Sequence, residues 1–173
     1  SNNIAGSRGV TLNSGDIIKT EVNSSAIIMF KNAIRISLKS SSRISLNSSS
    51  GEDNNKYSIT QFDGTVISKV ISLASGASYE VNTPSTNAGV RGTDFTTLVG
   101  VDGSTGLIVE EGIVALVKSL REQNTPTGEI DNQQETQDEE TVTVSAGQQA
   151  EVTQESEQIQ TSQVTNAEEA RNK

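Results

Sequence analysis

Two residue types that carry much of protein chemistry are missing from this chain, which has no cysteine and no histidine among its 173 residues. It therefore lacks disulfides, thiolate metal ligands, the commonest general base and the most reactive side-chain nucleophile. A Ser–Lys pair or two carboxylates would be the remaining catalytic groups, but the many serines occupy alternating polar positions and turns, where we expect them to face solvent. We predict that the chain is not an enzyme and has no catalytic, cofactor-binding or metal-binding residue.

Aromatic residues are also scarce, with three Phe, two Tyr and no Trp. Few side chains are therefore available to stack on nucleic-acid bases, and the net charge of −9 opposes contact with phosphate backbones and anionic membranes. The longest apolar run, AIIMF at 26–30, is too short for a transmembrane helix. These absences predict a protein partner, with no nucleic acid and no membrane insertion.

The negative charge is concentrated near the carboxyl end. Residues 1–120 contain ten basic and ten acidic residues, whereas residues 121–173 contain three and twelve. The segment 121–140 (REQNTPTGEIDNQQETQDEE) holds a single aliphatic residue, so it cannot bury enough apolar area to offset its ordering entropy. We predict a β domain over 1–152 with an acidic insertion at about 121–140, followed by a polar tail at 153–173.

Acidic groups raise the question of a hard cation such as calcium. Three of them offer oxygen ligands: Asp102-Gly103-Ser104, Glu110-Glu111 and Asp138-Glu139-Glu140. None has the spacing of an EF-hand or of a repeat-type calcium loop, which favours solvated acidic turns. Whether the acidic insertion binds a cation stays open at this point.

Period-two alternation is the strongest pattern that is present. Ile34, Ile36 and Leu38 alternate with Arg35 and Ser37, as in a half-buried strand. The segment RISLKSSS at 35–42 is then repeated as RISLNSSS at 43–50, a strand and a serine-rich turn in eight residues. Units this short must stack on neighbours to bury one apolar face.

Similar short runs fill most of the chain. Further strands are expected at about 9–12, 16–20, 25–30, 57–62, 65–73, 78–82, 94–99, 106–110, 112–118 and 141–152. Turns that tolerate positive φ separate them, at Asn13-Ser14-Gly15, Asp63-Gly64, Ser75-Gly76, Asp102-Gly103 and Ala146-Gly147. The pattern predicts an all-β fold of many short strands, either β-solenoid-like or a flattened β-sandwich.

The stretch TPSTNAGVRGTDF at 83–95 is the best candidate for a special site. Its run Arg91-Gly92-Thr93-Asp94 indicates either a charged ligand site or a tight structural junction. The junction is favoured, because Pro84 ends a hydrogen-bond ladder, Gly92 permits a conformation or close approach that a Cβ would block, and Thr93 can bond local backbone. Arg91 is then expected to pair with Asp94 or with a glutamate of Glu110-Glu111.

The order of these segments resembles the FecR-type extracytoplasmic domain, first met in regulators of ferric-citrate uptake. The matching segments are LNSGDIIKTEVNSSAIIMF (12–30), AIRISLKSSSRISL, QFDGTVISKV (61–70), YEVNTPSTNAGVRGTDF (79–95), GLIVEEGIVALV (106–117) and VSAGQQAEV (144–152), within residues 9–152. The resemblance centres on VNTPSTNAGVRGTDF followed by EEG and AGQ. It implies a structural role in the β framework for Gly112 and Gly147, as for the residues of 83–95.

Two functions follow from these observations. The first is a self-assembling surface or periplasmic subunit, because open sheet edges are templates for another chain. The sequence shows neither the membrane span before this domain nor the small α/β signalling domain after it that regulators of the family have, which favours this reading. The alternative is a FecR-type sensor in cell-surface signalling, implied by the resemblance. A carbohydrate-binding domain is a third reading, disfavoured by the scarcity of aromatic residues. Each places the chain outside the cytoplasm.

Overall fold

A computed structural model describes residues 5–30, 33–48, 56–71, 73–90, 92–119, 141–153 and 158–164. These residues form thirteen β-strands and no helix. The strands are β1 (Ile17–Lys19), β2 (Ala26–Phe30), β3 (Ile34–Leu38), β4 (Arg43–Ser48), β5 (Lys56–Val70), β6 (Ser78–Asn82), β7 (Thr86–Val90), β8 (Asp94–Val99), β9 (Thr105–Glu111), β10 (Ile113–Lys118), β11 (Thr141–Ser145), β12 (Gln148–Val152) and β13 (Gln160–Gln163). In this part of the chain there is no helix long and apolar enough to cross a membrane. The predicted all-β class is confirmed.

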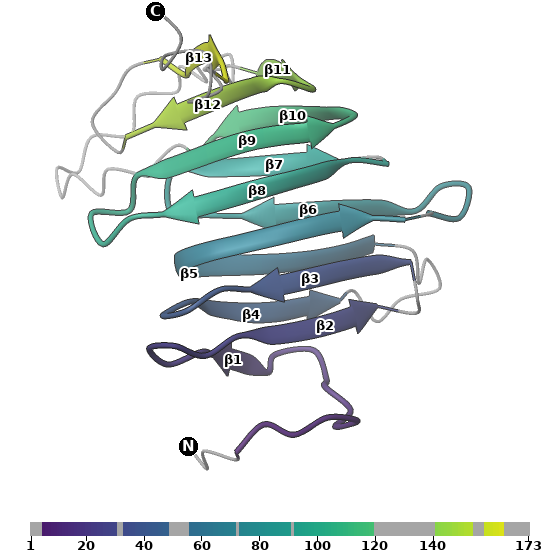
Figure 1. Ribbon diagram of the computed structural model, residues 1–173. Coiled ribbons are helices and arrows are strands. Elements are labelled where there is room, and N and C mark those ends of the chain that lie inside the picture. Colours follow the sequence, from purple (N-terminus) through teal and green to yellow (C-terminus); the bar gives the residue numbers. More distant parts are fainter. Residues whose placement is uncertain are drawn as a thin grey trace, which may run out of the picture.

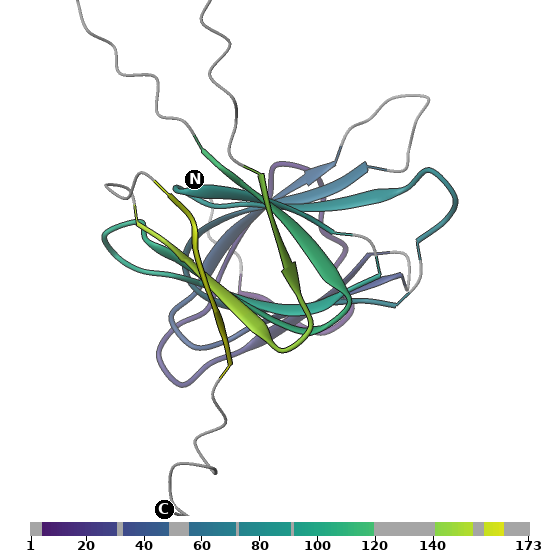
Figure 2. The same ribbon diagram turned by 90° about the horizontal axis from the view of Figure 1, so that it is seen from above.

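The strands form two facing sheets that share one strand (Figures 1 and 2). Sheet A has the order β1-β4-β5-β6-β7-β10-β11, and sheet B the order β2-β3-β5-β8-β9-β12-β13. The first half of β5 lies in sheet A and its second half in sheet B, with the change at Asp63 and Gly64. After β5, hairpins are added alternately to the two sheets, so the chain advances along the stack from β1 to β13.

This arrangement corresponds to the flattened sandwich of the two predicted architectures. Among the described strands, only β5 and β6 pair in parallel, and every other pair is antiparallel. A solenoid of parallel coils is therefore not what these strands build.

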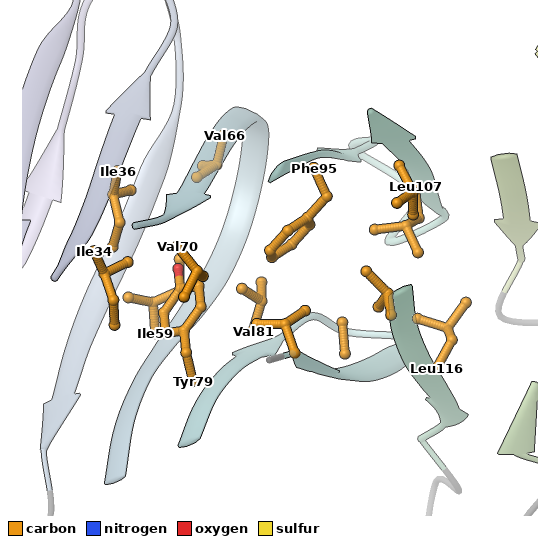
Figure 3. Packing of buried hydrophobic residues seen from close by; sticks show 14 of the residues in the cluster. Ile34, Ile36, Ile59, Val66, Val70, Tyr79, Val81, Phe95, Leu107 and Leu116 are labelled. Atoms are coloured by element: carbon orange, nitrogen blue, oxygen red, sulfur yellow. The ribbon is translucent and has the colours of Figure 1, made fainter. Parts of the chain in front are cut away.

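The core lies between the two sheets. Each strand contributes alternate side chains, as the period-two pattern requires, and Ile34, Ile36 and Val66 of sheet B face Ile59 and Val81 of sheet A (Figure 3). The rings of Tyr79 and Phe95 meet across the core with centroids 6.3 Å apart. The Tyr79 hydroxyl is 3.0 Å from the Ser68 hydroxyl on the opposite sheet, so even this buried polar group is paired.

Several strand predictions need correction. Residues 9–12 are not a strand. The run 57–62 and residues 65–70 of the run 65–73 belong to the single strand β5, because Asp63-Gly64 bends the strand instead of reversing it. Strand β7 was missed within 83–95, and the run 141–152 is two strands, β11 and β12. Strand β13 lies in the segment predicted as a polar tail and extends sheet B. The five predicted turn glycines all have positive φ.

The expectation that the serines face solvent is wrong for Ser42, Ser68 and Ser85, which are buried. Six buried hydroxyl side chains bond other side chains or the backbone: Thr20, Ser42, Thr83, Ser85, Thr97 and Thr105. Ser85 donates to Thr105 at 2.7 Å, and Thr105 donates to Thr83 at 2.8 Å. Thr20, Ser42 and Thr83 satisfy backbone carbonyls near the turns between strands.

Candidate functional site

Three crossings between the sheets meet at one end of the strands. They are the connections from β7 to β8, from β9 to β10 and from β11 to β12, and we call them together the glycine corner because they contain Gly92, Gly112 and Gly147. Thr93 is buried and its Oγ1 donates to the Ile113 carbonyl at 2.8 Å. The Ala146 amide donates to the Gly112 carbonyl at 3.0 Å. Backbone and hydroxyl groups therefore tie consecutive crossings together.

The three glycines of the corner differ in how much space surrounds the position that a Cβ would occupy. All three have positive φ, at +67°, +87° and +79° for Gly92, Gly112 and Gly147. A Cβ on Gly92 or Gly147 would meet no atom within 4 Å, whereas one on Gly112 would lie 2.7 Å from the Gly92 carbonyl oxygen and 2.9 Å from Thr93 Oγ1. The close backbone approach anticipated at Gly92 is thus a contact of its carbonyl with Gly112.

Asp94 and Glu110, two described charged residues of the predicted site, make contacts within the fold. Asp94 lies at the start of β8 and accepts an ion-paired hydrogen bond from Lys69 of the neighbouring β5. That bond, followed by the charge of Asp94, raises the pKa of the Lys69 ammonium above its usual value. Glu110 accepts a hydrogen bond of 3.0 Å from Thr96 Oγ1. Arg91 lies outside the described residues, so its predicted ion pair stays a prediction.

Pro84 lies at the opposite end of β7 from the glycine corner. It sits in the turn between β6 and β7, where the Thr83 amide donates to the Thr86 carbonyl at 2.8 Å. The structure thus brings Gly92, Thr93, Gly112 and Gly147 together, and leaves Pro84 at a separate site.

Pro84 helps to line a surface depression of about 730 Å³. The bend of β5, the serine-rich turn before β4 and the β8–β9 turn supply the other walls. Arg43 lies there with its guanidinium 4.9 Å from the Phe62 ring centroid and 2.9 Å from an Asp63 carboxylate oxygen. Val101, at the tip of the β8–β9 turn, is fully exposed. Exposed apolar and charged groups side by side suit a protein contact.

Sequence reasoning missed this depression. Its arginine opens the second copy of the repeat, and its aspartate and glycine were taken as a turn. Only the bend of β5 shows that the two segments lie together.

The acidic candidates show no cation site in the described residues, which contain no cluster of three or more potential ligands. The Asp102 carboxylate accepts hydrogen bonds from the Ser104 hydroxyl at 2.6 Å and the Ser104 amide at 3.0 Å. The bond from the Ser104 hydroxyl, and after it the bond from the Ser104 amide, lowers the pKa of Asp102. Residues 138–140 lie outside the described part of the chain. Asp102 therefore organises its own turn.

Every buried side-chain nitrogen or oxygen of the described residues has a hydrogen-bond partner. In this part of the chain no such group is left without a partner from the protein itself. In the described residues the buried polar side chains therefore serve to hold the fold together.

The family model described as "FecR protein" matches residues 16–115, and the chain belongs to this family. The matched range includes the glycine corner as far as Gly112. It confirms the resemblance inferred from the order of the sequence segments.

Solved structures show the same fold at low identity. Two crystal structures of "a putative anti-sigma factor" from Parabacteroides distasonis ATCC 8503 align with TM-scores of 0.63 and 0.62, each at 12% identity. The alignments cover 86% of this chain and 59% of that one, so the chain spans about three fifths of the length of these structures. No curated protein matches the sequence.

Proposed function

We propose that this chain is an extracytoplasmic regulatory module of an anti-sigma system, acting through protein–protein contacts without catalysis. The observation that carries the proposal is the FecR family match over residues 16–115, more than half of the chain. The likeness of fold to a protein described as a putative anti-sigma factor supports it. The module receives a signal from a partner protein, and contact with the sigma factor belongs to another part of the system.

The geometry of the domain is consistent with such a role. Its buried polar groups are all used internally in the described residues, and its exposed groups combine apolar and charged side chains around the depression. We further propose that the domain extends past the matched range to β13, with the acidic segment 121–140 inserted between β10 and β11 and with a polar tail after the last strand.

The comparisons favour this regulatory alternative over the self-assembling subunit. Neither the family match nor the similar structures provide support for a filament or an oligomer. Self-assembly is accordingly not retained as the proposed function.

Deletion of the gene in its native host tests the proposal. Transcripts measured genome-wide should change in a confined group of genes that share one promoter type, and the intact gene should restore them. An unchanged transcriptome under inducing and non-inducing conditions would contradict the regulatory function.

Localisation is tested separately on the native full-length protein. Protease added to spheroplasts should digest the domain, while a cytoplasmic marker in the same sample stays intact. Protection equal to that of the marker would contradict the extracytoplasmic placement.

A further inference from the structure

The edge strand β2 lacks the usual protections of an exposed sheet edge. It forms one margin of sheet B at the end of the stack and pairs, among the described residues, only with β3 (Figure 1). Its sequence AIIMF contains no charge and no proline, and its pairing with β3 has no register shift. Natural edges are usually blocked by one of these devices, because free amides and carbonyls attract another strand.

Two large apolar side chains of the edge strand β2 are exposed to solvent. Ile27 is 59% exposed and Met29 is 45% exposed, both on the outer face of sheet B. By contrast, β13 at the other margin of the same sheet carries only Gln, Thr and Ser. The margin formed by β2 thus offers backbone hydrogen-bonding groups and apolar surface together.

A row of charged residues runs across sheet B next to this margin. The strand registers place Met29 beside Arg35, Arg35 beside Lys69, and Lys69 beside Asp94. Two cations therefore stand directly opposite each other, an unfavourable arrangement in a sheet. Asp94 pairs with Lys69, while the exposed Arg35 has no ion pair among the described residues.

We infer that β2 accepts an added antiparallel strand from the partner protein, and that this strand carries a carboxylate opposite Met29. The inference rests on the proposed contact function and names its surface. A residue opposite Met29 lies two strand spacings, roughly 10 Å, from Arg35. Long glutamate and arginine side chains meet across that gap, and they would cover the exposed thioether between them.

The same row argues against a second copy of this chain as the occupant. Antiparallel pairing of two β2 strands about Ile28 would place the other copy's isoleucine opposite Met29. That arrangement supplies no carboxylate, and Arg35 would stay without an anion. The chemistry of the row therefore fits a heterologous acidic strand.

A synthetic peptide of the inferred type is the probe. In the sequence Thr-Val-Glu-Val-Ile-Val-Thr the glutamate faces Met29, the isoleucine faces Ile27, and the valines continue the inner face. The control peptide has lysine in place of the glutamate. Fluorescence anisotropy with the whole chain measures affinity, and hydrogen exchange of the β2 amides reports where the peptide binds.

The glutamate peptide should bind and protect the amides of β2, and Met29→Glu should weaken it roughly tenfold or more, because the new edge charge lies opposite the peptide's glutamate and repels it. Arg35→Glu should reverse the preference between the two peptides by roughly two- to fivefold, the size of an exposed charge interaction. Both side chains are exposed, so melting temperatures should stay near that of the wild type.

Equal binding of the two peptides, or binding unaffected by Met29→Glu, would overturn the inference. So would a wild-type dimer in sedimentation that Met29→Glu dissociates, because the occupant would then be a second copy. These measurements do not involve transcription. A silent deletion strain would therefore reject the regulatory function while leaving the peptide result intact.

Discussion

Replacing Gly112 with alanine should destabilise the fold more than the same change at Gly147, although both glycines have positive φ in the glycine corner. An alanine in the left-handed region costs about 1–2 kcal/mol at either position. At Gly112 its Cβ would also lie 2.7 Å from the Gly92 carbonyl oxygen and 3.1 Å from Thr93 Cα, both backbone atoms that cannot rotate away. Such overpacking adds about 1–3 kcal/mol.

Urea unfolding followed by circular dichroism measures the difference. We expect Gly112→Ala to lower the free energy of unfolding by about 2–5 kcal/mol and Gly147→Ala by about 1–2 kcal/mol. Gly76→Ala is a second control, because Gly76 has φ +81° with no atom within 4 Å of its Cβ position and lies outside the corner. Equal losses for all three variants, at unchanged m-values, would refute the close-approach argument.

Three further predictions concern single interactions. Gly64→Ala should lower the free energy of unfolding by at least about 1–3 kcal/mol through overpacking, because the new Cβ would lie 2.5 Å from Ser42 Cα in the serine-rich turn. A melting curve like that of the wild type would contradict this. Burial raises the pKa of Tyr79, and its hydrogen bond with Ser68 only partly offsets that increase. Above pH 10.0 the Tyr79 hydroxyl therefore ionises in the unfolded chain but stays protonated in the folded one, so the stability of the fold should decrease there. Tyr79→Phe should flatten that alkaline decline in urea titrations at several pH values, and an unaltered slope would exclude Tyr79 as its source. Ser104→Ala should raise the pKa of Asp102 toward its usual 3.8, and NMR titration of the carboxyl carbon in both proteins measures the shift; an unchanged value would show that the hydroxyl contributes nothing.

The sequence was most informative where alternation and glycine placement agree. Ile34, Ile36 and Leu38 are buried as the alternation predicts, and the predicted turn glycines have positive φ. The Gly64 turn was nevertheless misjudged. Positive φ occurs both in hairpin turns and in a strand that bends from one sheet to another, so glycine alone does not distinguish them.

Other features depended on distant partners. Strand β7, TNAGV, consists mainly of small residues of weak strand propensity, and it is a strand because β6 and β10 pair with it on both sides. The buried hydroxyls Ser68 and Thr97 did leave a signal, since they occupy the inward positions of alternating runs. Their polar character outweighed that pattern in the sequence-based interpretation. The depression around Arg43 and Phe62 could not be predicted without the pairing of β4 with β5.

The shared strand β5 gives the stack an uneven mechanical strength. Because the strands lie across the stack, a pull between β2 at one end and β13 at the other peels strands away one after another instead of shearing whole ladders. At β5 this peeling has to release both sheets at once, since β5 pairs with β3, β4, β6 and β8. A partner that pulls on either end of the stack therefore separates the terminal hairpins first and the strands around β5 last.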